Sequence, residues 1–312
     1  MHDHHHSHHG HTGDHHHGVH RKLFWALALT LGFAGVEAVA GWWSGSLALL
    51  GDAGHMLTDA SALGLAAFAS LLALRRPSSK HTYGLGRAEI LAALFNALLM
   101  IGLVALISAE AIRRFNHPTP VMGSAVMGVA FIGLLVNLVA AWLLSHDHDN
   151  LNVRAALLHV LGDLMGSVAA LISGAIISLT GWMTIDPLLS LLIVLLILVS
   201  ALRVLREALH TLMEGVPLHL DLSHIGHTMV AVEGVTSVHD LHVWSLSASR
   251  AALSAHIVIR EPGAWPEVLK QLRETLMREF GIDHVTLQPE SETTLVPVEA
   301  LHRHPDEASV PR

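Results

Sequence analysis

The sequence predicts an α-helical membrane protein with six transmembrane helices and a small cytosolic α+β metal-binding domain. Three observations support this prediction. The 312 residues are 52% apolar and only 14% charged, whereas an average soluble domain is about 25% charged. Six apolar segments are each long enough to cross a hydrocarbon core of about 30 Å. After residue 210 the apolar runs shorten and charged residues return.

The six apolar segments are separated by turn residues and charged loops. They cover residues 22–44, 46–74, 88–113, 121–145, 151–180 and 184–206. Gly45 and its flanking serines predict a tight hairpin between the first two segments, and Pro118 and Pro120 separate the third from the fourth. A soluble protein with a fully buried helical core is the alternative architecture, and the distribution of loop charges disfavours it.

Lys and Arg residues in the short loops predict the orientation in the membrane. With the N-terminus in the cytosol, the outside holds only Arg113 and Arg114. The inside holds nine such residues: Arg21, Lys22, Arg75, Arg76, Lys80, Arg87, Arg154, Arg203 and Arg206. We therefore expect an integral, multi-pass protein with both termini in the cytosol.

The domain organisation follows from the same changes in composition. We expect a His-rich tail over residues 1–20, a six-helix transmembrane domain over 21–210, a cytosolic domain over 211–291 and a polar, disordered tail over 292–312. The apolar pattern of the cytosolic domain predicts the order αββαβ. Its helices are expected over 221–233 and 264–280, and its strands over 235–246, 250–260 and 283–290.

The N-terminal tail holds eleven of the 27 histidines, together with Asp and Gly. Because it has no apolar face to bury, we expect it to be disordered and to bind metal loosely. The histidines assigned to this loose binding are His4, His5, His6, His8, His9, His15, His16 and His17. An expression tag is the alternative origin, which the irregular spacing disfavours.

Composition also restricts the chemistry of the chain. Cysteine is absent, which excludes disulfides, thiol nucleophiles and Cys-type zinc fingers, so any metal must be held by His, Asp or Glu. The formal net charge of −8 gives no sign of nucleic-acid binding.

Two matched His/Asp pairs lie inside predicted spans, where ionisable residues are costly and are functional candidates. The second span carries His55 and Asp59, and the fifth carries His159 and Asp163. Residues four apart share one helix face, and both pairs lie near the midplane, roughly 12–14 Å from the ends of their spans. Two imidazoles and two carboxylates suit tetrahedral Zn²⁺, with Co²⁺ or Cd²⁺ as alternatives. The competing interpretation is an intrahelical hydrogen bond in each pair.

Other polar residues are embedded in the predicted spans. Asp52 lies one turn before His55, where it could relay protons or line a vestibule, or could cap the helix. Interhelical hydrogen bonds explain Glu37, Asn96 and Asn137 adequately.

The cytosolic domain contains a second candidate metal site. His239 and His256 flank a predicted hairpin centred on Ser247–Ala248, which makes them direct cross-strand partners with Cβ atoms about 5 Å apart. Glu290, at the end of the last strand, is a plausible third ligand. His242 is expected on the other strand face and is the weaker candidate. The alternative is two ordinary, half-buried strand histidines.

Several motifs of the chain occur in the order typical of one transporter family. They are LGDAGH at residues 50–55, YGLGRAEIL at 83–91, IDP at 185–187 and HDLHVW at 239–244. With the six spans, they resemble the cation diffusion facilitator family, especially its zinc transporters of the His-Asp/His-Asp type. The resemblance implies a transport site at His55, Asp59, His159 and Asp163, and a cytosolic zinc site at the positions of His239, His256 and Glu290. It also implies a homodimer that exchanges metal for protons by alternating access.

The chain departs from some members of this family at three places. The loop 75–87 offers only His81 as an accessory ligand, and Gly86 stands where some relatives have His, which makes a metal site in this loop doubtful. Gln288 stands where some relatives carry another His, so the cytosolic site is expected to hold one ion. The loop 145–150 is short; a small metal site there is less expected than a solvated loop.

The leading functional hypothesis is a proton-coupled antiporter that exports Zn²⁺ from the cytosol, with Zn²⁺ also as a structural or regulatory ion. Protons compete with metal for imidazole near neutral pH. A membrane-bound metal sensor and an intramembrane metalloenzyme are the alternatives. We expect no enzyme, because four ligands fill the zinc coordination shell and no HExxH motif is present. The expected partners are divalent cations, protons and membrane lipid, and the resemblance suggests a bacterial cytoplasmic membrane.

Overall fold

The computed structural model describes residues 14–144, 151–248 and 250–291; the side chains of residues 14–27, 143–144, 151–156, 158 and 159 lie outside the description. The chain forms two compact units. The first contains residues 1–68 and 92–206, and the second contains residues 69–91 and 207–312. The predictions for residues 1–13, 145–150 and 292–312 concern residues outside the described part of the chain.

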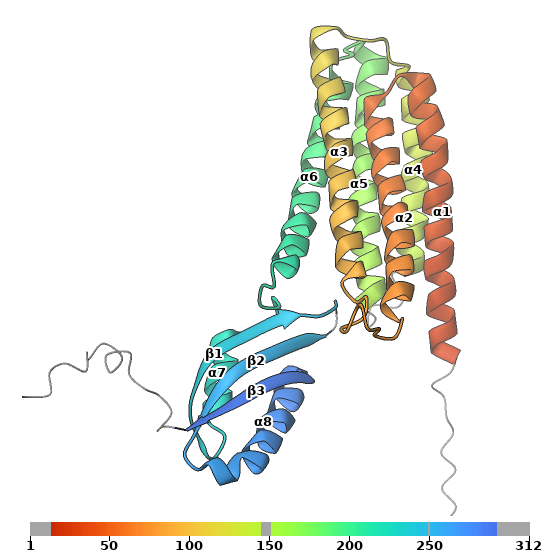
Figure 1. The fold of residues 1–312 in the computed structure, drawn as a ribbon. Coiled ribbons are helices and arrows are strands. Elements are labelled where there is room, and N and C mark those ends of the chain that lie inside the picture. Colours follow the sequence, from red (N-terminus) through yellow and green to blue (C-terminus); the bar gives the residue numbers. More distant parts are fainter. Residues whose placement is uncertain (1–13, 145–150, 249, 292–312) are drawn as a thin grey trace, which may run out of the picture. The chain divides into compact units, whose positions relative to one another are not determined.

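Six long helices, all expected from the apolar segments, build the first unit (Figure 1). They are α1 (Asp14–Ser44), α2 (Leu47–Ala73), α3 (Ala88–Asn116), α4 (Gly123–Leu144), α5 (Leu151–Thr180) and α6 (Ile185–Leu212). Within the described residues, α2 to α6 each contain a stretch long and apolar enough to cross a membrane. The remaining long helix, α1, is described with its side chains only from residue 28 onward.

Two helix ends differ from the expected boundaries. α1 begins at Asp14, so residues 14–20 are helical and not disordered as expected for the whole tail. Histidine has an ordinary helix propensity and does not end a helix. α6 continues to Leu212, beyond the expected end at 206, because its apolar face recurs through Ala208.

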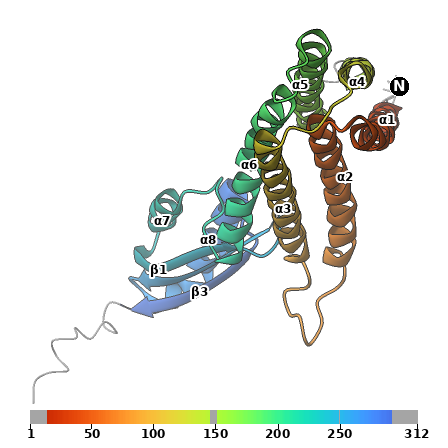
Figure 2. The ribbon, with the colours of Figure 1, turned by 90° about the horizontal axis from the view of Figure 1, so that it is seen from above.

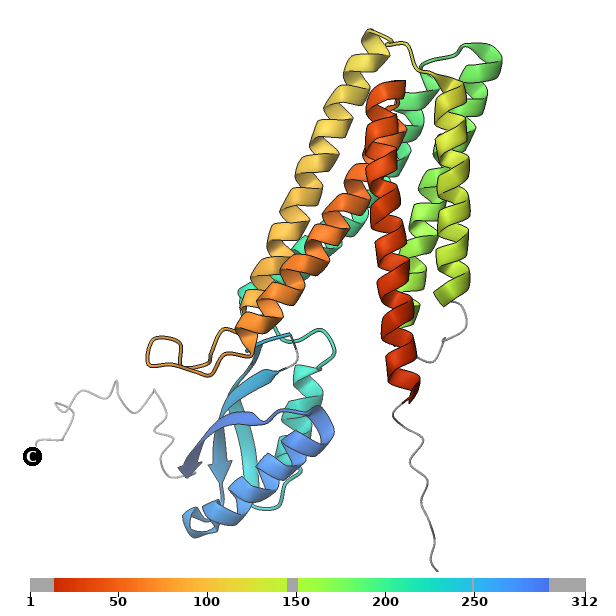
Figure 3. The same cartoon turned by 90° about the vertical axis from the view of Figure 1, so that its right-hand side faces the viewer.

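α2 packs between two apolar clusters of the first unit. Leu47 joins a cluster with α3 and α6, whereas Ala48 and Leu49 join a cluster with α4 and α5. α4 lies beside both α1 and α5 (Figure 2). In Figure 3, α2 and α3 diverge from α4 and α5 toward the Ala73 end of α2. Large apolar side chains such as Leu106 and Leu179 remain exposed, as expected for helices that face lipid.

The second unit contains the predicted αββαβ fold, with one added 3₁₀ turn. Its elements are α7 (Leu222–Val230), β1 (Val235–Ser245), β2 (Ala251–Ile259), η1 (Pro262–Ala264), α8 (Trp265–Phe280) and β3 (His284–Ser291). The sheet order is β1-β2-β3, with β1 and β2 antiparallel and β2 and β3 parallel. Parallel strands need a crossover, which α8 provides.

A buried core fixes one face of this sheet. Ile225 and Met229 of α7 and Leu272 and Leu276 of α8 pack against inward-facing strand residues such as Leu253. Asp221 caps α7 by accepting hydrogen bonds from two backbone N–H groups of its first turn, at 2.8 and 3.3 Å. The opposite sheet face therefore stays free to carry polar side chains.

The loop before α3 belongs to the second unit. Arg87 pairs with Glu214 at 3.2 Å, and a Cβ atom at Gly86 would lie 2.7 Å from a side-chain atom of the β1–β2 connection. A histidine at that position therefore does not fit without movement. His81 and His242 both line a cleft of about 730 Å³ in this unit, and His81 joins no group of three metal-ligating residues within the described chain.

Candidate functional site

The first predicted pair lies on one face of α2, as expected. The Nε2 atom of His55 is 3.6 Å from the Oδ2 atom of Asp59, and the two side chains are 19% and 20% exposed. The Thr58 hydroxyl donates to the backbone carbonyl of His55 at 2.7 Å, within the same turn. An imidazole nitrogen and a carboxylate oxygen are thus presented together inside an apolar helix.

The second pair is described in part. Asp163 is buried and lies in α5, four residues after His159, whose side chain lies outside the description. A ligand set that includes the His159 imidazole therefore stays a prediction.

α2 and α5 are in contact at one point near these pairs. A Cβ atom at Gly166 of α5 would lie 2.6 Å from Oδ1 of Asp52 of α2. The two helices run in opposite directions, since α2 descends from the α1–α2 connection and α5 ascends to the α5–α6 connection (Figure 1). A larger residue in place of Gly166 would therefore require the Asp52 side chain to move.

That contact sets the relative level of the two pairs. Antiparallel helices advance in opposite directions by about 1.5 Å per residue. Three residues from the contact, in the direction away from the α1–α2 connection, His55 of α2 lies level with Asp163 of α5. Seven residues from the contact, in the same direction, Asp59 of α2 lies level with His159 of α5. The backbone thus agrees with the expectation that the pairs occupy the same depth.

A polar cluster was only partly anticipated. Asn137 of α4 donates from Nδ2 to the Ser167 hydroxyl of α5 at 3.2 Å, which confirms the expected interhelical hydrogen bond. The same expectation is wrong for Asn96, whose amide contacts Met100 of its own helix. It is also wrong for Glu37, because neither carboxylate oxygen has a hydrogen-bond partner among the described residues.

Asp52 does not cap α2. It lies in the second turn, whereas Asp186 accepts from the Leu47 amide at 2.6 Å and the Ser46 hydroxyl accepts from the Leu49 amide at 3.3 Å. The capping interpretation is therefore wrong, because other side chains already occupy the first turn. Asp52 remains buried and available for another role.

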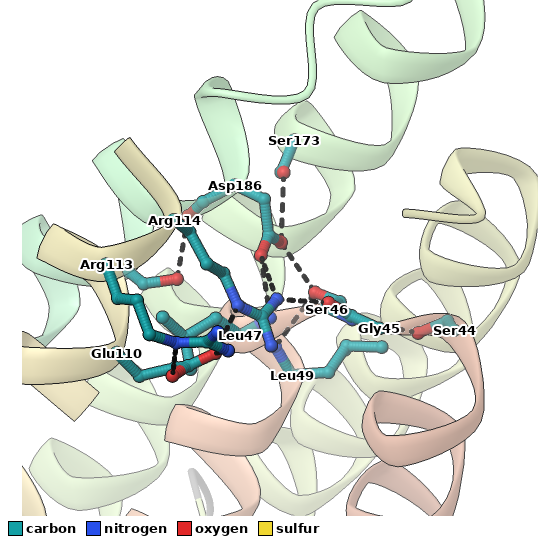
Figure 4. Close-up of polar contacts among 11 residues, drawn as sticks. Ser44, Gly45, Ser46, Leu47, Leu49, Glu110, Arg113, Arg114, Ser173 and Asp186 are labelled. Atoms are coloured by element: carbon teal, nitrogen blue, oxygen red, sulfur yellow. Dashed lines mark hydrogen bonds and ion pairs between the residues drawn. The ribbon is translucent and has the colours of Figure 1, made fainter. Parts of the chain in front are cut away.

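Sequence reasoning did not anticipate the role of Asp186, the first acidic residue of α6 (Figure 4). Its fully buried carboxylate accepts from the Ser46 hydroxyl at 2.6 Å and lies 4.0 Å from Nη1 of Arg114. Arg114 also donates to the carbonyl of Gly45 and pairs with Glu110 at 2.8 Å. This network joins α3 and α6 to the α1–α2 connection. In the sequence, Asp186 stands out only as part of the IDP motif before the sixth span.

The cytosolic site is fully described. Nδ1 of His256 lies 2.6 Å from one carboxylate oxygen of Glu290, and Nε2 of His239 lies 2.9 Å from the other. Ligand atoms of the three residues lie within 4.8 Å of one another. The hydrogen bonds from His256 and His239 lower the pKa of the Glu290 carboxyl. Two imidazoles and a carboxylate at this spacing can hold Zn²⁺.

The register of the hairpin differs from the expected one, although His239 and His256 are paired as predicted. Ser245 pairs with Ala251 next to the turn, and an unbroken ladder would then place Asp240 opposite His256. A β-bulge at Asp240, whose φ is 52°, shifts the register by one residue. The correct pairing therefore depends on a bulge as well as on the turn.

The same bulge corrects the placement of His242. It lies on the sheet face of His239 and His256, because its partner Ser254 is two residues from His256. The expected alternation is wrong since the bulge adds one residue between His239 and His242. Asp240 accepts from His242 Nε2 at 3.0 Å and lies 3.7 Å from His256 Nε2.

Comparisons with known proteins cover nearly the whole chain. The cation efflux transmembrane domain matches residues 23–213, and the cytoplasmic domain of cation efflux proteins matches residues 217–292. The zinc transporter ZitB of Escherichia coli is 44% identical over 86% of this chain and 87% of its own length. A cadmium, cobalt and zinc/H⁺-K⁺ antiporter of Bacillus velezensis is 39% identical over 95% and 94% of the two chains.

The metal cation efflux protein CzcD of Cupriavidus metallidurans is 42% identical over 89% of both chains. A solved structure of its metal-bound C-terminal domain shares 38% identity, covering 23% of this chain and 99% of that domain, with a TM-score of 0.22. The family and sequence matches confirm the resemblance to the cation diffusion facilitator family. The chain belongs to the cation efflux family, also called the cation diffusion facilitator family, of multi-pass membrane transporters.

Proposed function

We propose that this cation efflux transporter exports Zn²⁺ from the cytosol, in exchange for protons, through a site formed by His55, Asp59, His159 and Asp163. The main support is the close approach of α2 and α5 at Asp52 and Gly166. Because it sets both His/Asp pairs at one level, four ligands from two helices can face a single ion.

The ligand chemistry favours Zn²⁺. Two nitrogen and two oxygen ligands match its tetrahedral preference, and two carboxylates balance its charge. The similar proteins whose names mention a metal are zinc transporters or transporters of cadmium, cobalt and zinc. The same ligands accept protons when the metal leaves, since imidazole titrates near neutral pH. Competition between Zn²⁺ and protons for these ligands is sufficient to couple the movement of one to the movement of the other.

The cytosolic site and the assembly extend this proposal. His239, His256 and Glu290 hold a second Zn²⁺ that stabilises or regulates the cytosolic domain, and the chain acts as a homodimer. Lys and Arg are in excess in the loops expected on the cytosolic side of the membrane, which supports an orientation with both termini in the cytosol.

Flux in proteoliposomes tests the transport function. A zinc-sensitive dye and a pH-sensitive dye are enclosed in vesicles that contain the purified protein. We expect Zn²⁺ to enter only with the protein present, together with proton movement in the opposite direction. A metal sensor or a metalloenzyme gives no protein-dependent flux, and Zn²⁺ movement without any proton signal contradicts the antiport mechanism.

Replacing His55 by Asp is expected to broaden metal selectivity. The change replaces a nitrogen ligand with an oxygen ligand and adds a negative charge, and carboxylates suit Mn²⁺ better than imidazoles do. Competition among Zn²⁺, Cd²⁺ and Mn²⁺ for flux measures the effect, with Mn²⁺ gaining most. His81→Asp makes the same chemical change in the loop before α3 and serves as the control. An unchanged order of preference shows that His55 does not set selectivity.

Replacing Glu290 by Gln is expected to remove the cytosolic ion. The change keeps the shape of the side chain but removes its charge, and loss of a direct ligand should cost more than the roughly 10–100-fold typical of an outer-shell partner. Equilibrium dialysis of the full-length protein should show one fewer tightly bound Zn²⁺ per protomer. Glu267→Gln, an exposed carboxylate in the first turn of α8, is the matched control. Equal Zn²⁺ content in both variants refutes the site.

A further inference from the structure

We propose that the helical unit contains a second cation subsite made only of oxygen ligands, formed by Glu37 of α1, Asp52 of α2 and Asn137 of α4, next to Asp163 of α5. Its ligand is a divalent metal ion. The subsite extends the proposed function and relies on it only for the direction in which the ion travels.

Four helices bring these side chains together. A Cβ atom at Gly133 of α4 would lie 3.1 Å from Oε1 of Glu37, and Asn137 lies one turn further on the same helix face. The amide of Asn137 donates to Ser167 of α5, the neighbour of the glycine that contacts Asp52. Asn137 therefore links the segment of α4 that lies next to Glu37 to the segment of α5 that contacts Asp52.

The acceptor atoms of this cluster lack donors. Both oxygens of Glu37, Oδ2 of Asp52 and Oδ1 of Asn137 are buried and have no hydrogen-bond partner among the described residues. The three side chains are at most 2% exposed. The nitrogen of Asn137 is bound to Ser167, so the oxygen of its amide is the atom that remains available as a ligand. Buried oxygen acceptors without donors are costly unless a cation satisfies them.

The charges support a cation as the missing partner. Glu37, Asp52 and Asp163 contribute three buried acidic side chains to this part of the helical unit. Arg114, a described cation of the same unit, is occupied by Glu110 and Asp186. A divalent metal ion would cancel two of the three negative charges and occupy several oxygen atoms at once.

The position of the subsite suggests its use. Asp52 precedes His55 by three residues, about 4.5 Å along α2, toward the α1–α2 connection. Asp163 is a ligand proposed for the transport site and also neighbours the subsite. An ion that leaves the imidazoles can therefore pass to the all-oxygen subsite without losing every protein ligand. We infer that this subsite receives the ion on the way to the outer side.

Mn²⁺ binding to the purified full-length protein tests the subsite, because imidazoles bind Mn²⁺ weakly whereas carboxylates suit it. The starting variant carries His55→Ala, Asp59→Asn, His239→Ala and His256→Ala, which disable the other two sites. We expect this protein to retain one Mn²⁺ per protomer by equilibrium dialysis. Adding Glu37→Gln and Asp52→Asn should weaken that binding at least 100-fold, whereas adding Glu110→Gln should leave it unchanged.

Asn137→Asp provides an independent variant, since it adds a charged oxygen ligand and keeps the size of the side chain. It should tighten Mn²⁺ binding at least tenfold. Absence of bound Mn²⁺ in the starting variant, or equal binding after the Glu37 and Asp52 changes in a protein that elutes and unfolds normally, overturns the subsite. Either result is expected if Glu37 and Asp52 bind only protons and no metal ion. Failure of the proposed transport site is distinguished from failure of the subsite by flux. If the transport site is wrong, Zn²⁺ flux is undiminished in the starting variant.

Discussion

Replacing Asp59 or Asp163 by Asn abolishes Zn²⁺ flux, if these two carboxylates are ligands of the transported ion. Each change removes an oxygen ligand and one of the two charges that balance the dication. The expected loss in apparent affinity exceeds 100-fold, because a direct ligand matters more than the outer-shell partners that contribute about 10–100-fold. Initial rates of Zn²⁺ uptake into proteoliposomes, across a range of free Zn²⁺, measure the effect.

The isosteric change keeps the experiment interpretable. Asp163 is buried and Asp59 is largely enclosed, so substitution by Ala would also create a cavity. Glu207→Gln, which neutralises an exposed carboxylate of α6, is the control and should transport normally. Near-normal flux in either Asp variant, at equal incorporation into vesicles, rules out the assignment of that residue to the transport site.

The six spans could be predicted because a membrane helix is a local property of the sequence. An apolar stretch of sufficient length must form a helix to satisfy its own backbone in lipid. The αββαβ order of the cytosolic domain could be predicted for a related reason, since α8 and the three strands show clear apolar periodicity. Helix ends were less accurate, as at Asp14 and Leu212, because they depend on weak local preferences.

The bulge at Asp240 shows where a local pattern is insufficient. Counting residues from the turn gave the right pairing of His239 and His256 but the wrong face for His242. An Asp with positive φ is uncommon, although Asp tolerates this conformation better than most residues. Alternation of apolar and polar residues does not reveal where a strand holds an inserted residue, because the pairing of the partner strand is not visible in the sequence.

The buried carboxylates show a second limit. Glu37 could be recognised as embedded, but the structure was needed to show that no donor reaches it. Asp186 is 140 residues from Ser46, with which it forms a hydrogen bond. A pairing at that separation leaves no periodic signal in one sequence, and the motif around Asp186 indicated only a helix start.

Replacing Asp186 by Ala is expected to destabilise the helical unit more than any other single change considered for this chain. The carboxylate is fully buried and accepts from the Ser46 hydroxyl and the Leu47 amide, both at 2.6 Å. Arg114 lies 4.0 Å from it. The substitution leaves these donors without their acceptor, and breaking such a buried network costs about 3–5 kcal/mol. The free energy of unfolding, from denaturant titration of the purified protein in detergent, measures the loss.

Ser190→Ala is the matched control for Asp186→Ala. Ser190 is also buried in α6, one turn later, but its hydroxyl donates only to the backbone carbonyl of Asp186 within the same helix. Its loss should cost about 1 kcal/mol or less. Because the Asp186 network joins α3 and α6 to the α1–α2 connection, whereas the Ser190 bond joins nothing across helices, the two variants separate interhelical anchoring from simple loss of a buried polar atom. Equal stability of the two proteins shows that the anchor does not hold the helices together.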